Sequence, residues 1–156
     1  MKNDYYDIAI NDLGFLEFNL ASEFYNQIAI NCQQVAEKML KSVLDEIATG
    51  CESLLHSRNL RGIYDKIHAI DNSFSLSRGD LSMLKDIYFD AKYPGDNFVT
   101  VTHEECKEYV DILNTVIEAT NDFRKRNGLA VVECGQLTLG VQECNFFGLF
   151  HYEFGR

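Results

Sequence analysis

The sequence contains a single proline, Pro94, among its 156 residues. Chains that stay disordered or form collagen are rich in proline or in charge, whereas this chain has 46% hydrophobic, 12% aromatic and 24% charged residues. Its length matches one ordinary domain, which can bury a hydrophobic core without disulfides or metal ions. The composition therefore indicates one folded globular domain.

Basic residues are also scarce, because 14 Lys and Arg stand against 24 Asp and Glu and leave a net charge of −10. On average such a chain repels a polyanion, so contact with nucleic acid would require a local basic patch. The charge balance argues against a general DNA- or RNA-binding protein.

Several functional signatures are missing. No stretch approaches the roughly 20 apolar residues that a membrane-spanning helix needs. The opening MKNDYYDIAINDLG lacks the basic, apolar and small-residue order of a secretory signal. The five cysteines include no C-x-x-C pair and no zinc-finger spacing to histidine, and there is no phosphate-binding loop, serine-hydrolase elbow or H-E-x-x-H site. We therefore expect a cytoplasmic protein with reduced thiols, without membrane association, metal or cofactor.

Apolar residues that recur three or four positions apart predict an all-α fold, an up-and-down bundle of four to five helices. The longest stripe ends before Gly50, which tolerates the positive φ of a helix C-terminus. The fourth helix stops at Pro94, because a residue before proline is pushed out of helical geometry. Thr102 and Glu105 fit a capping box. The predicted helices span residues 4–20, 23–49, 59–70, 78–93 and 103 to about 126.

The inward positions of these stripes give the predicted core. Its members are Ile28, Val35, Met39, Leu40, Val43, Leu84, Ile87, Leu113, Val116 and Ile117.

After Gly128 the helical period disappears. The remainder is rich in valine, leucine and aromatic residues and is interrupted by glycines, which favours extended structure. We divide the chain into a helical bundle, residues 1–127, and an extended or β-like tail, residues 128–156, that is not a separate domain. Its apolar character predicts burial against this chain or a partner, with poor order or a non-native extension as alternatives.

Polar residues follow one edge of the second predicted helix in the stretch QQVAEKMLK, residues 33–41. Gln33, Glu37 and Lys41 fall on one row of the helix, and Lys38 falls on the adjacent row. The simpler interpretation is a solvated ion pair of Glu37 with Lys41, worth roughly a few tenths of a kcal/mol. The alternative is a binding surface.

Four features occur in order along the chain: the 33–41 block, His56 four residues before a leucine, the triplet Lys92-Tyr93-Pro94, and a final amphipathic helix. In this order they resemble the HEPN domain family, over roughly residues 4–124. The resemblance implies a helical bundle, usually dimeric. In some members it binds nucleotides or associates with nucleic acid, and it is often produced beside a small nucleotidyltransferase in toxin-antitoxin pairs. The ligand-binding candidates that it implies are Lys38, Lys41, His56, Tyr88, Lys92 and Tyr93.

Two departures separate the chain from the family pattern. The family's usual RYP is KYP here, which keeps a cation but loses the two-pronged geometry that a guanidinium offers a phosphate. The tail after Gly128 has no counterpart in the family. Each candidate also has a structural interpretation, since His56 fits a loop or capping residue and Tyr93 before Pro94 fits a helix stop with a buried ring.

Some family members are metal-independent ribonucleases that use an Arg-x(4–6)-His motif, and Arg61 with His68 satisfies that spacing. The pattern arises easily by chance. The resemblance places the catalytic motif on a later helix, near residues 92–103, where no arginine occurs. On one helix the two side chains would also stand about 10 Å apart along the axis. We therefore predict a dimeric module of a toxin-antitoxin or stress system that binds a nucleotide, an RNA end or a nucleotidyltransferase partner, without strong catalysis of its own. Two alternatives remain: a ribonuclease toxin and a purely structural interaction module.

Overall fold

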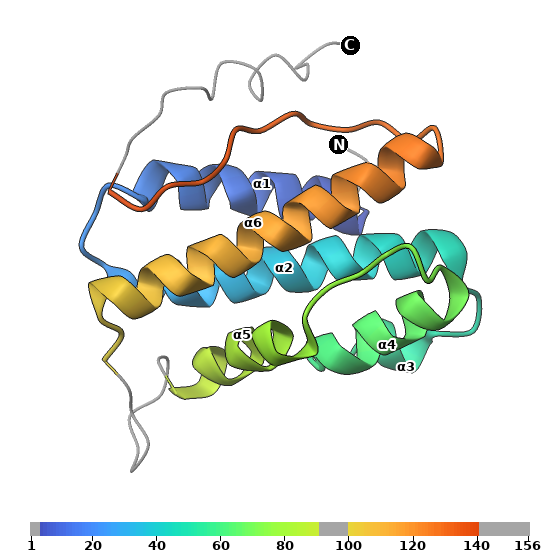
Figure 1. The fold of residues 1–156 in the computed structure, drawn as a ribbon, viewed down its shortest axis with the longest axis horizontal. Helices are drawn as coiled ribbons and strands as arrows, with labels where there is room; N and C mark the ends of the chain where they lie inside the picture. The colour runs from blue at the N-terminus through green and yellow to red at the C-terminus, as the bar shows by residue number, and fades with distance from the viewer. Residues whose placement is uncertain (1–3, 91–99, 141–156) are drawn as a thin grey trace.

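The computed structural model describes residues 4–90 and 100–140, with backbone only at 88–90 (Figure 1). The described chain contains six helices and no strand, which confirms the predicted all-α bundle. The bounds are α1 Tyr5–Asn19, α2 Tyr25–Ile47, α3 Glu52–Leu55, α4 Leu60–Ile70, α5 Arg78–Asp90 and α6 His103–Arg126. The prediction of four to five helices missed α3, a single turn between the second and third predicted helices. The predicted stop at Pro94 lies outside the described residues.

Local signals account for the helix ends. Asp4 caps α1 by accepting a hydrogen bond from the amide of Asp7 at 2.8 Å. Gly50 adopts a φ of +71° shortly after α2 ends, as a residue without a side chain can. The predicted capping box is present at the start of α6, where the Glu105 carboxylate accepts a hydrogen bond from the amide of Thr102 at 2.8 Å.

Helix α2 is the centre of the bundle. It packs against α1 and α6 and also against the α3, α4 and α5 group, so neighbouring helices surround it (Figure 1). All ten predicted core residues are buried, which confirms the apolar stripes on α2, α5 and α6. An aromatic cluster extends this core, with the rings of Phe74 and Phe123 packed edge to face at a centroid distance of 6.4 Å.

The first part of the predicted tail, residues 129–140, is an irregular segment that runs back over α6 and α1 (Figure 1). Arg124 donates a hydrogen bond to the carbonyl of Ala130 at 2.7 Å, and its guanidinium lies 3.6 Å from the ring centroid of Tyr6. Farther along, the Asn114 side chain makes two 2.9 Å hydrogen bonds with the backbone of Leu137, whose side chain is buried. Residues 129–140 are therefore bound to the bundle by specific side chains.

Within the described residues, no helix is both long enough and apolar enough to cross a membrane.

Candidate functional site

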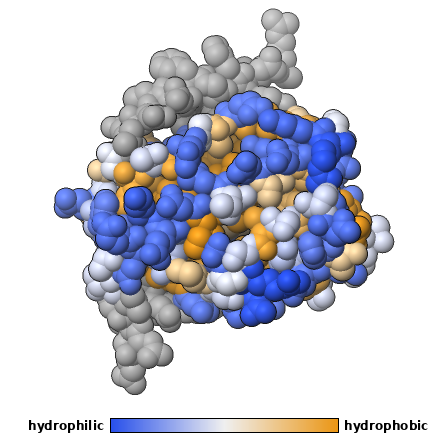
Figure 2. All heavy atoms as spheres, in the orientation of Figure 1, coloured by the Kyte–Doolittle hydropathy of each residue, from blue (hydrophilic) through white to orange (hydrophobic). Residues whose placement is uncertain are grey.

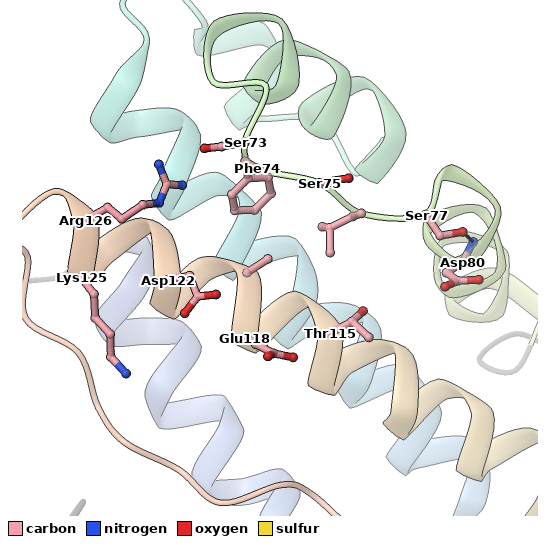
Figure 3. Close-up of a pocket in the computed structure, with 12 residues that line it drawn as sticks. Ser73, Phe74, Ser75, Ser77, Asp80, Thr115, Glu118, Asp122, Lys125 and Arg126 are labelled. Carbon is pink, nitrogen blue, oxygen red and sulfur yellow. Dashed lines mark hydrogen bonds between the residues drawn. The ribbon is translucent and has the colours of Figure 1, made fainter.

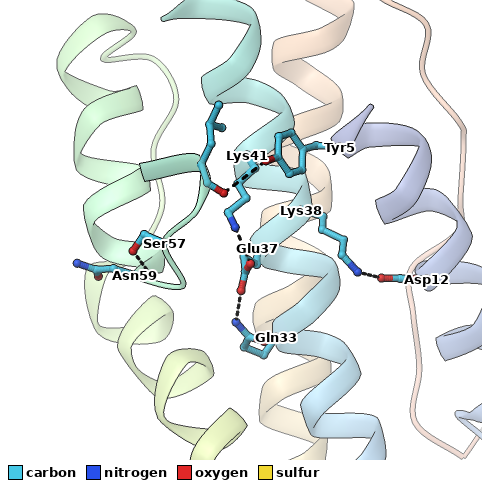
Figure 4. A network of polar contacts seen from close by, with 9 residues as sticks. Tyr5, Asp12, Gln33, Glu37, Lys38, Lys41, Ser57 and Asn59 are labelled. Atoms are coloured by element: carbon cyan, nitrogen blue, oxygen red, sulfur yellow. Dashed lines mark hydrogen bonds and ion pairs between the residues drawn. The ribbon is translucent and has the colours of Figure 1, made fainter. Parts of the chain in front are cut away.

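The polar block on α2 is a buried network (Figure 4). Glu37 lies between two partners, because it accepts a hydrogen bond from Gln33 Nε2 at 2.9 Å and forms an ion pair with Lys41 Nζ at 2.7 Å. The side chains of Lys41 and Glu37 are only 7% and 15% exposed, and Gln33 is 1% exposed. The predicted Glu37–Lys41 pair therefore forms, but its interpretation as a solvated pair is wrong.

Two further groups meet the Lys41 end of this network. The Lys41 ammonium lies 5.9 Å from the ring centroid of Tyr5 on α1, and the Tyr5 hydroxyl donates a 3.4 Å hydrogen bond to the carbonyl of Leu55 on α3. At the other end, Gln33 Oε1 is buried and has no hydrogen-bond partner among the described residues. A buried acceptor without a partner usually lowers stability, so a hydrogen bond from an added donor would be favourable here.

The remaining ligand-binding candidates are spread over the molecule. Lys38 points to α1, where it is paired with Asp12 (Figure 4). His56 is exposed at the end of α3. Tyr88 belongs to α5, but its side chain lies outside the described residues, as do Lys92 and Tyr93. The structure therefore connects Lys41 through Tyr5 to the α3 turn that His56 ends, while it directs Lys38 to a different helix.

Arg61 and His68 both lie on α4, as predicted. Nδ1 of His68 is 2.8 Å from the carbonyl oxygen of Phe74, and its ring stacks on Tyr64 at a centroid distance of 5.4 Å. Arg61 is exposed in the first turn of the helix. His68 thus anchors the α4–α5 loop, a role that the spacing of the two residues did not suggest.

The buried thiols are structural as well. Burial raises the pKa of the Cys32 thiol well above its usual value and that of Cys106 to about 12. Burial likewise raises the pKa of Cys134 to about 11. These thiols stay protonated near neutral pH, so they are poor nucleophiles. The four described cysteines are unpaired, and no group of three potential metal ligands occurs among the described residues.

Sequence reasoning missed an open groove of about 810 Å³ between the α4–α5 loop and the outer face of α6 (Figure 3). Phe74, Leu76 and Ala119 supply apolar lining. Its polar lining combines hydroxyls, three carboxylates and two cations: Ser73, Ser75, Ser77, Thr115, Asp80, Glu118, Asp122, Lys125 and Arg126. The sequence does show that Thr115, Glu118 and Asp122 recur at helical intervals and so share one face of α6. It does not show that the α4–α5 loop lies across that face and forms a groove.

The groove is electrostatically acidic. Both cations that line it are engaged, because Arg126 pairs with Asp71 at 3.1 Å and Lys125 pairs with Glu133 at 2.9 Å. Glu118 and Asp122 lie four residues apart on the exposed side of α6, and neither forms an ion pair with another described residue. The wider surface is also polar, since hydrophilic residues cover most of the face in Figure 2, with smaller hydrophobic areas between them.

Comparison with known proteins identifies the family. The model of the HEPN domain matches residues 3–123, which is most of the chain. No curated protein and no solved structure matches the chain. The matched segment contains α1 to α5 and most of α6, including the buried α2 network. The chain therefore belongs to the HEPN domain family.

Proposed function

We propose that this HEPN protein is a dimeric binding module that recognises a protein partner and has no strong catalytic activity of its own. A small nucleotidyltransferase of a toxin-antitoxin or stress-response pair is the partner class that family membership favours. The observation that carries the proposal is the acidic groove, because it combines apolar lining with unpaired carboxylates on a chain of net charge −10.

The state of the cations supports a protein partner over a polyanion. Many Lys and Arg side chains are already held by internal contacts, so they are not available to neutralise phosphates without breaking those contacts. The side chains that form ion pairs with carboxylates include Lys38, Lys41, Arg78, Lys125 and Arg126.

A nucleotide or an RNA end is the second candidate ligand. The exposure of His56 after α3 and of Arg61 at the start of α4 favours it, since these two side chains lie at the two ends of the short α3–α4 connection. In this proposal Lys92 holds a phosphate and Tyr93 stacks on a base, with Tyr88 nearby in the chain. Lys38 and Lys41 contribute to this site only after they leave Asp12 and Glu37. Ribonuclease activity through Arg61 and His68 is the less favoured alternative, because His68 is tied to the loop carbonyl of Phe74.

Co-purification tests the proposal most directly. The protein is expressed with and without the product of the neighbouring gene, and the purified material is analysed by mass spectrometry for bound protein and by nucleotide analysis for bound ligand. A stoichiometric complex with the neighbouring product supports partner binding. A nucleotide or RNA bound in its place favours the second candidate, and a homogeneous protein with neither contradicts both. Light scattering on the same sample tests dimerisation.

A further inference from the structure

The α4–α5 loop presents an extended segment beside the groove. Burial alternates along residues 73–77, because Phe74 is buried and Leu76 is half-buried whereas the three serines between and beside them are exposed. Such alternation with a period of two is typical of extended backbone. Figure 3 shows this segment stretched between α4 on one side and α6 on the other.

The hydrogen bonds of this segment fix the direction of its backbone groups. The carbonyl of Phe74 is bound by His68 at 2.8 Å, and the amide of Leu76 donates to the Tyr64 hydroxyl at 3.2 Å, so both groups point to α4. In an extended chain the backbone groups of the intervening residue point the opposite way. Within the described part of the chain, the amide and carbonyl of Ser75 form no hydrogen bond.

The opposite wall of the groove supplies side-chain recognition. Thr115, Glu118 and Asp122 follow one exposed stripe of α6, and the lining extends to Arg126. The eleven steps from Thr115 to Arg126, at about 1.5 Å each, give roughly 16 Å, the length of about five extended residues. One wall therefore offers a backbone donor and acceptor, the other offers two carboxylates without an ion pair in the described chain, and Leu76 and Ala119 add one apolar side chain to each wall.

We propose that this groove binds an extended, lysine- or arginine-rich segment of the protein partner, with apolar residues between its basic ones. The segment pairs with the backbone of Ser75 as an added strand, a recognised mode of peptide binding. Its basic side chains reach Glu118 and Asp122, and its apolar side chains cover Leu76 and Ala119. This inference deepens the proposed function and rests on it.

A synthetic probe tests the groove independently of the native partner. The probe is a fluorescein-labelled peptide of six residues that alternates lysine and valine, and its binding is followed by fluorescence anisotropy at low and high salt. We expect Glu118→Gln combined with Asp122→Asn to weaken binding about tenfold at low salt, because two exposed ion pairs are lost. The control is Asp45→Asn combined with Glu46→Gln, which removes the same charge from exposed residues at the end of α2 and should change binding by less than about twofold.

A second measurement tests the strand edge. N-methylation of alternate backbone amides in the probe keeps its charge but removes the donors that would face Ser75, so binding should fall about fivefold. Methylation in the other register should have little effect, because those amides point away from the loop. This comparison needs no protein variant, so it stays valid if substitutions in the loop disturb folding.

The outcomes separate this inference from the proposed function. Equal weakening by the two double variants, or equal binding of both methylated probes, would show unspecific attraction to an acidic protein. Either result would refute the proposal that the groove binds the peptide. If the co-expressed partner binds wild type and the Glu118/Asp122 variant equally well, partner binding is supported but the groove is refuted as the binding site. If wild type forms no complex but binds the probe selectively, the groove is supported and the proposed function fails.

Discussion

Breaking the Glu37–Lys41 pair should destabilise the fold far more than breaking a surface pair. Lys41→Met keeps the length and apolar volume of the stem but removes the ammonium, and it leaves the Glu37 carboxylate with Gln33 Nε2 as its described partner. A solvated i, i+4 pair contributes about 0.3–0.5 kcal/mol. Removing one partner of a buried pair costs about 3–5 kcal/mol.

The exposed fractions decide where this pair lies between the two limits. The side chains of Lys41 and Glu37 are 7% and 15% exposed, so they are mostly removed from water. The retained hydrogen bond from Gln33 and the residual exposure of Glu37 reduce the loss of stability when Lys41 is replaced. We therefore expect Lys41→Met to lower the free energy of unfolding by about 2–3 kcal/mol. Replacing both partners, as Lys41→Met with Glu37→Leu, should recover most of that loss, because no uncompensated charge stays buried.

Urea denaturation of wild type, the two single variants and the double variant closes a double-mutant cycle. The expected interaction energy is about 2 kcal/mol, since the residues are in direct contact. Lys38→Met is a matched control, because its pair with Asp12 is more exposed, at 27% and 24%. An interaction energy below about 0.5 kcal/mol for Glu37 and Lys41 would refute the reasoning and restore the solvated interpretation.

Four further predictions concern the core, the thiols, the anion site and the pH dependence. Met39→Asp should lower the free energy of unfolding by several kcal/mol, measured in urea, because it buries an unpaired charge; a variant as stable as wild type would contradict the assigned core. Thiol counting on denatured, unreduced protein should find all five cysteines free, and three or fewer would contradict the expected reducing compartment. If the KYP segment binds nucleotide, titrations should show weaker binding for Lys92→Ala than for Lys2→Ala and a steep loss with salt, and equal losses would count against the site. Hydrogen bonds from the Thr102 backbone and side chain lower the pKa of Glu105 below its usual 4.5. The capping box therefore stabilises α6 above that pH and loses its contribution as pH falls through the lower folded value, so acidification should destabilise wild type more than Glu105→Gln.

Much of the fold followed from local sequence patterns. Helical period, the glycine after α2 and the Thr102–Glu105 capping box predicted five of the six helices. The helical period also predicted core residues that are all buried. These signals act within one or two turns of chain, so they can be recognised without knowing what packs against them. The single turn of α3 escaped because four residues contain no full period.

The environment of the α2 polar row was decided only by tertiary structure. A helical wheel placed Gln33, Glu37 and Lys41 at the edge of an apolar stripe, which suggested contact with water. Helices α1, α3, α4, α5 and α6 all pack on α2, however, so even the edge of its stripe is covered. Periodicity reports the direction of the apolar face, but not how many neighbours surround the helix.

Contacts between distant parts of the chain could not be predicted from the sequence either. Residues 129–140 are held partly by Tyr6, whose hydroxyl accepts a hydrogen bond from the amide of Val132, 126 positions away along the chain. The acidic groove exists because the α4–α5 loop lies across the outer stripe of α6. The sequence by itself determined which segments become helices and which faces are apolar, since propensity, capping and period are local. The docking of those segments determined which polar groups are buried, paired or free, because burial depends on residues brought together from anywhere in the chain.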